Sequence, residues 1–103
     1  MQFVRSTVIV SAILAMSGPA MAQTFIDERE AHQQERIEQG IKSGQLTGRE
    51  TRQLERGEGR IDRVEGRDLA KGPLTAHERE HLNRMLNRES RRIYRDKHNA
   101  AHR

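Results

Sequence analysis

The stretches GQLTGRE (Gly44–Glu50) and GPLTAHE (Gly72–Glu78) are two copies of one pattern, and they mark where helices begin. In each copy a Gly is followed by Leu and Thr, and a Glu stands three residues after the Thr. This spacing is a capping box, in which the Thr hydroxyl accepts from an amide of the first helical turn while the Glu carboxylate accepts from the Thr amide. The pattern predicts helices that start after Thr47 and after Thr75, and each Gly ends the segment before it.

Apolar residues at helical spacing divide the remaining chain into three helices. The first is predicted to start with Thr24 as its N-cap and to end at Gly40 and Gly44. The second follows Thr47, and the third runs from Ala76 to His98. No segment shows strand-like alternation, so the predicted fold class is all-α: a small antiparallel helical hairpin or a three-helix bundle. The expected apolar positions are Ile26, Ile37, Ile41, Leu54, Ile61, Val64, Leu69, Leu82, Met85, Leu86, Ile93 and Tyr94.

The second helix contains three glycines, and two interpretations of them stay open. Gly57 stands in the apolar stripe, and Gly59 and Gly66 lie further along the helix. Each Gly costs about 1 kcal/mol relative to Ala in a helix interior. Either the glycines permit the close approach of another helix, or they are tolerated on a solvated surface.

Residues 1–22 have the three parts of a secretory signal. Arg5 is followed by an apolar run from Val8 to Met16 and by the small-residue sequence Ala20–Ala22. The run is short of the roughly 20 residues that a membrane-spanning helix needs. We therefore expect a cleaved signal peptide at 1–22, a helical domain at 23–98, a frayed tail at 99–103 and a periplasmic location.

The predicted mature chain is polar and has little material for a core. It has no Cys, which excludes disulfides and thiolate metal sites, and only 13 of its 81 residues are Leu, Ile, Val or Phe. That share, about 16 %, is below the roughly 20 % at which chains of high net charge tend to be disordered. A thin core predicts marginal stability or stabilisation by a partner.

The third helix opens with HEREH (His77–His81), which matches the H-E-x-x-H zinc-protease signature. The motif falls in the first turn of a helix that is expected to be exposed, and Glu78 already belongs to the capping box. The chain is also small for a substrate cleft, so we expect no enzyme activity. An EF-hand reading of the two Gly-Leu-Thr loops fails as well, because their ligand positions lack the required oxygen donors.

Two histidine pairs at i, i+4 spacing suggest a non-catalytic metal site. His77 and His81 form one pair, and His98 and His102 form the other. Such a pair can chelate Zn²⁺ or Cu²⁺ from one face of a helix. The alternative interpretation is that these histidines are solvated on charged faces.

The chain is basic, with a net charge of +4 and a pI of about 10.3. Acidic residues are interleaved with the basic ones, and an exported protein does not ordinarily meet DNA, so we expect no nucleic-acid partner. Contact with anionic lipid headgroups or lipopolysaccharide is a weaker alternative to a solvated helix face. The residues that come nearest to a basic patch are Arg88, Arg91, Arg92, Arg95 and Lys97.

The boxes at Leu46–Glu50 and Leu74–Glu78 resemble the Leu-Thr-x-x-Gln boxes of the Spy-like periplasmic stress proteins, with Glu in place of the family's Gln. The chain also resembles uncharacterised small exported helical proteins of proteobacteria through its Ser90–His98 stretch. The first resemblance implies a helical, chaperone-like protein of the periplasm.

Two functions compete at this point. The first is a non-catalytic, chaperone-like or stress-related binding protein, which would use partly covered apolar stripes of the second and third helices to hold a protein partner or a second copy of itself. The alternative is a periplasmic metal-binding or metal-buffering protein that would use the paired histidines.

Overall fold

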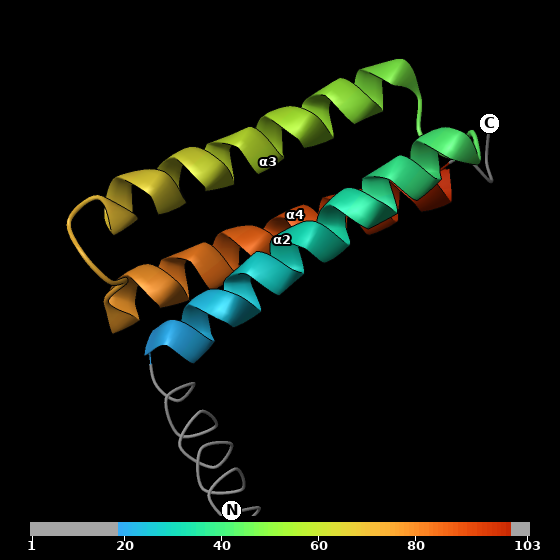
Figure 1. Ribbon diagram of the computed structural model, residues 1–103. Coiled ribbons are helices and arrows are strands. Elements are labelled where there is room, and N and C mark those ends of the chain that lie inside the picture. Colours follow the sequence, from blue (N-terminus) through green and yellow to red (C-terminus); the bar gives the residue numbers. More distant parts are fainter. Residues whose placement is uncertain (1–18, 100–103) are drawn as a thin grey trace, which may run out of the picture.

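Three long helices pack side by side in the computed structural model, which describes residues 19–99 (Figure 1). They are α2 (Pro19–Lys42), α3 (Gly48–Leu69) and α4 (Ala76–Asn99), and the described residues contain no strand. The all-α prediction is therefore confirmed, as a three-helix bundle. Most of the predicted signal peptide and nearly all of the predicted tail lie outside the described residues, 1–18 and 100–103 respectively.

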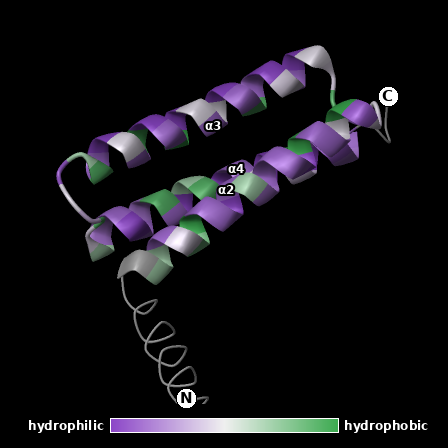
Figure 2. Ribbon diagram, in the orientation of Figure 1, coloured by the Kyte–Doolittle hydropathy of each residue, from purple (hydrophilic) through white to green (hydrophobic). Residues whose placement is uncertain are grey.

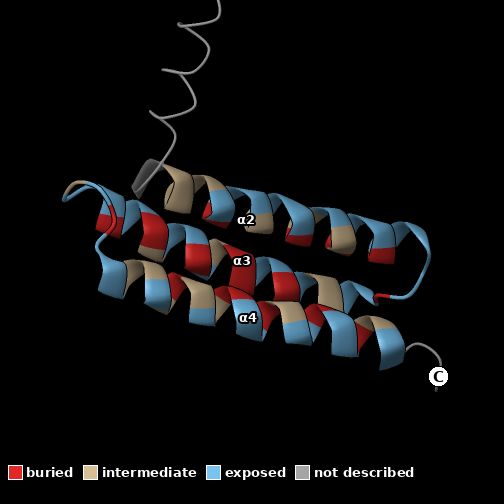
Figure 3. Ribbon diagram, turned by 90° about the horizontal axis from the view of Figure 1, so that it is seen from below, coloured by how far each residue is buried: buried red, intermediate tan, exposed pale blue. Residues whose placement is uncertain are grey.

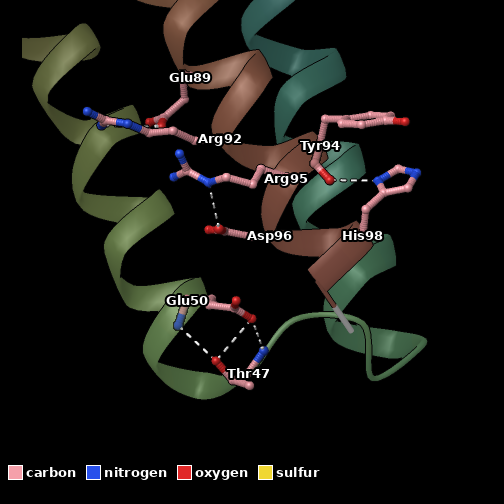
Figure 4. Close-up of polar contacts among 8 residues, drawn as sticks. All are labelled: Thr47, Glu50, Glu89, Arg92, Tyr94, Arg95, Asp96 and His98. Atoms are coloured by element: carbon pink, nitrogen blue, oxygen red, sulfur yellow. Dashed lines mark hydrogen bonds and ion pairs between the residues drawn. The ribbon is translucent and has the colours of Figure 1, made fainter. Parts of the chain in front are cut away.

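Both predicted capping boxes are formed. The Glu50 amide donates to the Thr47 hydroxyl at 3.1 Å, and the Thr47 amide donates to the Glu50 carboxylate at 3.0 Å (Figure 4). In the second box the corresponding distances between Thr75 and Glu78 are 3.1 Å and 2.9 Å. The starts of α3 and α4 are thus fixed locally, because each box satisfies two backbone donors that a helix start leaves unpaired.

The glycines before the boxes end the preceding segments as predicted. Gly44 and Gly72 have φ values of 76° and 129°, a region that side chains with a Cβ rarely adopt. Gly44 donates to the Ile41 carbonyl and Gly72 to the Leu69 carbonyl, at 3.2 Å and 3.1 Å. These turns let the chain reverse within a few residues.

The predicted start of the first helix is wrong. The helix α2 already includes Pro19 through Ala22, so Thr24 lies inside it and is not its N-cap. Pro is accepted in the first turn of a helix, where its missing N–H would have no partner, and Ala and Met favour helix. The helix therefore extends upstream through the residues that precede Thr24.

The helix α4 packs against both other helices, whereas α2 and α3 touch less. Hydrogen bonds join Arg29 to Asn83 and Arg36 to Ser90, a constant offset of 54 residues, so α2 and α4 run parallel. Short turns make α3 antiparallel to both. This arrangement makes α4 the helix on which the bundle depends.

Two small apolar clusters form the core (Figures 2 and 3). Most of the predicted stripe is buried, and Leu82, Leu86 and Ile93 are fully inaccessible to solvent. Three predicted positions are instead exposed, namely Ile41, Leu69 and Tyr94. Ile41 and Leu69 lie at the ends of α2 and α3, whereas Tyr94 follows the buried Ile93 and lies off the packed side of α4. One cluster contains Ile26, Ile61, Leu74, Leu82 and Leu86, and the other contains Ile37, Leu46, Leu54 and Ile93.

A polar layer separates the two clusters. On each helix a buried polar residue stands between residues of the two clusters: Gln33 on α2, Glu58 on α3 and Glu89 on α4. Gln33 Nε2 donates to the Leu86 carbonyl at 2.8 Å. The core is therefore interrupted at its centre by groups that need hydrogen bonds.

Gly57 sits in this layer and decides between the two interpretations of the α3 glycines. A Cβ on Gly57 would overlap the Glu89 carboxylate, so this glycine leaves room for a side chain of α4. Gly66 has open space around it, and Gly59 has only the end of the Arg63 side chain nearby. A contact with another helix, through the Glu89 side chain, thus explains Gly57 alone, while the other two glycines are tolerated.

The second capping box should contribute measurably to stability. Replacing Thr75 by Ala removes the hydroxyl that accepts from the Glu78 amide, and we expect a loss of about 1 kcal/mol in the free energy of unfolding. Urea denaturation followed by circular dichroism measures this loss. An unchanged unfolding midpoint would show that the cap does not hold the start of α4.

Alanine at Gly57 and at Gly66 should act in opposite directions. We expect Gly66→Ala to stabilise the protein by up to about 1 kcal/mol through helix propensity. Gly57→Ala must displace the buried Glu89 carboxylate and should cost roughly 1–3 kcal/mol. Thermal melts of both variants measure the contrast, and a stabilised Gly57→Ala would contradict the packing described here.

Candidate functional site

The bundle sorts its charged side chains by sign. Every ionisable residue that is buried within the described part of the chain is acidic: Glu58, Glu65, Asp68, Glu89 and Asp96. A carboxyl group can lose its charge when it is buried, whereas a guanidinium, whose pKa lies far above the physiological range, cannot. The surface is therefore more basic than the composition suggests.

The exposed face of α3 carries a continuous row of arginines. They recur at spacings of three and four residues, which places them on one side of a helix over about 27 Å. Sequence reasoning missed this row, although its spacing was a readable signal. Its members, all exposed, are Arg49, Arg52, Arg56, Arg60, Arg63 and Arg67.

The helix α4 carries a second basic row with the same periodicity. Its residues recur at alternating spacings of four and three and include three of the five residues predicted as a basic patch. Arg92, a fourth, lies beside the row, whereas Lys97 points elsewhere on the helical wheel. The row consists of His77, His81, Arg84, Arg88, Arg91, Arg95 and His98.

A groove between α3 and α4 joins the two rows. It consists of two adjoining pockets of about 270 Å³ and 400 Å³, which share Arg60 and Arg92 as lining residues. Arg56 and Arg95 line the larger pocket, and Arg88 lines the smaller one. Arginine guanidiniums offer paired donors that match phosphate and carboxylate oxygens, so this groove suits an anionic ligand.

Glu89 forms part of the smaller pocket and is its unusual member. The residue is 2 % exposed, and neither of its carboxylate oxygens accepts a hydrogen bond. Its nearest cation is Arg92, whose Nη1 lies 3.9 Å from Oε1, and both side chains reach from α4 toward α3 (Figure 4). Burial raises the pKa of Glu89, while Arg92 and Arg60 act in the opposite direction.

Two further acids of the bundle hold their protons to unusually high pH. Burial raises the pKa of Glu58 to about 7, with the nearby Glu89 carboxylate as the next cause. Burial, together with hydrogen bonds to Asp62 and Glu65, raises the pKa of Glu30 to about 9. Both groups therefore remain largely protonated under mildly acidic conditions.

Glu30 also belongs to an acidic cluster between α2 and α3. One carboxylate oxygen from each of Asp27, Glu30 and Glu65 lies within 4.8 Å of the others, a geometry that suits a hard cation with oxygen ligands. Gln23 Nε2 donates to Glu65 at 2.7 Å and to Asp27 at 3.1 Å. The Gln23 amide thus partners two members of the cluster, whereas Glu30 Oε1 is buried without a hydrogen-bond partner.

The predicted histidine sites are not brought together. His77 and His81 lie in the first two turns of α4, whereas His98 lies about 25 Å away along the same helix. His98 Nδ1 is 2.6 Å from the Tyr94 carbonyl, and its ring stacks on Tyr94. Among the described residues no His joins two other potential ligands, and His102 lies outside them. Chelation of Zn²⁺ or Cu²⁺ by His77 and His81 alone stays a prediction.

Glu78 of the H-E-x-x-H motif is held by the capping box. Its carboxylate accepts from the Thr75 amide and lies 3.1 Å from Lys71 Nζ. These contacts lower the pKa of Glu78 to about 2, which is opposite to the tuning that a general base near neutral pH requires.

Comparisons of the chain with protein-family models, with curated proteins and with solved structures find no match. None of the helices in the described part of the chain has an apolar stretch long enough to cross a membrane.

The raised pKa values predict a protein that is more stable in mild acid. Between pH 4.5 and the folded-state pKa values, the unfolded chain releases protons that folded Glu30 and Glu58 retain, so stability falls as the pH rises. We expect a higher urea midpoint at pH 5 than at pH 8. Glu30→Gln should raise the midpoint at pH 8 and reduce the difference, whereas the exposed Glu35→Gln should do neither. A wild-type midpoint that is higher at pH 8 would contradict this assignment.

Proposed function

We propose that this chain is a small, non-catalytic binding protein of the cell envelope that docks on anionic membrane surfaces through the arginine rows of α3 and α4. The observation that supports this function is the sorting of charge: some of the carboxyl groups are buried in the bundle, whereas no arginine of the described residues is buried. Each cation held near an anionic bilayer contributes about 1 kcal/mol to binding, so the two rows together suffice for stable attachment.

The composition of the arginine face favours lipid phosphates over other polyanions. Protein interfaces usually have an apolar centre that is depleted of charge. Among the described residues, the outward face formed by the two arginine rows has no such apolar centre, which argues against a protein partner. Proteins bind single-stranded nucleic acids partly by stacking the bases on aromatic rings. Neither exposed aromatic residue of the described chain belongs to the arginine rows, because Phe25 lies on α2 and Tyr94 lies off the row of α4. An exported protein would also meet lipid headgroups before it met nucleic acid.

Capture of a protein client through apolar stripes receives less support. Those stripes were predicted to be partly covered, yet Leu54, Ile61, Leu82, Leu86 and Ile93 are all at most 2 % exposed. Their exposure would require the bundle to open. The resemblance to Spy-like stress proteins is in keeping with a helical protein of the cell envelope. We propose that its binding surface is the basic face and not the apolar stripes.

Vesicle co-sedimentation tests the proposed function. We expect the predicted mature chain to bind vesicles of phosphatidylcholine with phosphatidylglycerol, to bind phosphatidylcholine alone much more weakly, and to dissociate as salt screens the charges. Replacing Arg56 and Arg95 together by Gln should weaken binding about 30-fold, since two cations contribute about 2 kcal/mol.

The matched control replaces Lys42 and Lys97 by Gln. This variant loses the same charge at positions outside the two rows, so its binding should change several-fold less. Equal losses in the two variants would show that only net charge matters. Failure of the wild type to bind anionic vesicles would refute the function.

A further inference from the structure

The smaller pocket between α3 and α4 differs from the rest of the basic face. Arg60, Arg88 and Arg92 line it together with His81, and it has a volume of about 270 Å³. A water molecule occupies about 30 Å³ of liquid volume, so the pocket holds a ligand of several heavy atoms. Ile61 and Met85 supply apolar wall.

A buried carboxylate inside this ring of cations constrains the ligand. Glu89 lies against Gly57, is almost wholly buried, and has two oxygens that accept no hydrogen bond from the protein. Leaving such a group without a partner costs free energy, and a hydrogen-bond donor on the ligand would recover it. A cationic donor would be repelled by the three guanidiniums. A fully ionised anion would be repelled by Glu89.

A protonated oxyanion meets both conditions. Its charged oxygens accept from the guanidiniums. Once the Glu89 side chain, whose oxygens are both buried, turns toward the pocket, the single hydroxyl of the ligand donates to a Glu89 oxygen. One proton then lies between two oxygens that would otherwise repel. Inorganic phosphate carries such a hydroxyl near neutral pH, and a phosphate monoester, whose second pKa is about 6, carries one in mild acid. Sulfate and phosphodiesters carry none. The pairing forms and breaks no covalent bond.

We propose that the pocket formed by Arg60, Arg88, Arg92 and Glu89 is a binding site for a phosphate group that bears a proton. The assignment rests on the proposed function, because it names the phosphate chemistry that the basic face would prefer. It uses different residues from Arg56 and Arg95, so the two hypotheses can fail separately.

The charges around Glu89 set the conditions of the test. Arg60, Glu55 and Glu58 face it from α3, and Arg92 and Asp96 lie nearby on α4. His81 lines the same pocket, and Arg36 of α2 acts on Glu58. At pH 8 a protonated Glu89 contributes least, so a preference for phosphate over sulfate there reports the proton that phosphate brings.

Calorimetric titration of the predicted mature protein at pH 8 with inorganic phosphate and with sulfate tests the site. We expect phosphate to bind about 10- to 100-fold more tightly than sulfate, the range of one charge-assisted hydrogen bond. Glu89→Gln should bind both anions similarly, because a Gln amide donates to either. Arg60→Gln combined with Arg88→Gln should lose both.

The control is Arg84→Gln, an exposed position in the same row that does not line the pocket and pairs with Glu80. It should keep the selectivity of the wild type. Circular dichroism melts confirm that each variant is folded. Equal affinity for phosphate and sulfate in the wild type, binding of neither, or selectivity that survives Glu89→Gln would overturn the proposal.

Two vesicle compositions distinguish the source of the phosphate. At about pH 6 phosphatidic acid presents a monoester of which a large share carries a proton, and phosphatidylglycerol presents a diester that carries none. A preference for phosphatidic acid vesicles that disappears in Glu89→Gln assigns the site to a lipid headgroup. If the protein selects free phosphate over sulfate but shows no preference for phosphatidic acid vesicles, the site binds a soluble phosphate.

Discussion

The contact between Gly57 and Glu89 is the constraint on which the rest of the bundle depends. It brings α3 and α4 together at the centre of the molecule and places a carboxyl group between two small apolar clusters. Neither cluster is large, because few apolar residues are available. Helix packing and the protonation of the central acids are therefore linked, since an ionised carboxylate in this layer opposes the packing that buries it.

The same physical chemistry accounts for the basic surface. Carboxyl groups enter the interior because they can be neutralised by a proton, as the raised pKa values of Glu30 and Glu58 show. Arginine keeps its charge, so it stays at the surface, where its apolar stem covers part of the helix and its guanidinium is solvated. A chain with nearly balanced charges thus acquires a positive exterior through folding alone.

A phosphate-bearing ligand connects these two features. The arginine rows provide long-range attraction and many weak contacts, which suit a surface rather than a single molecule. The pocket beside Glu89 adds a position where one hydrogen bond can select among anions. Because Glu89 lies between α3 and α4, against Gly57, occupation of the pocket would act directly on the packing at the centre of the bundle.

The sequence by itself determined the helical class, the starts of α3 and α4 and the glycine turns, because capping boxes and αL glycines act within a few residues. Most buried positions also followed from the apolar periodicity, and the arginine row of α3 was readable in the same way. Tertiary structure alone decided that Gly57 is a contact and Gly66 is not, that Tyr94 is exposed, and that Glu89 lines a pocket among arginines. These properties depend on which helix faces which. Gly57 and Glu89, for example, are more than thirty positions apart in the chain, and local sequence patterns carry no information over that separation.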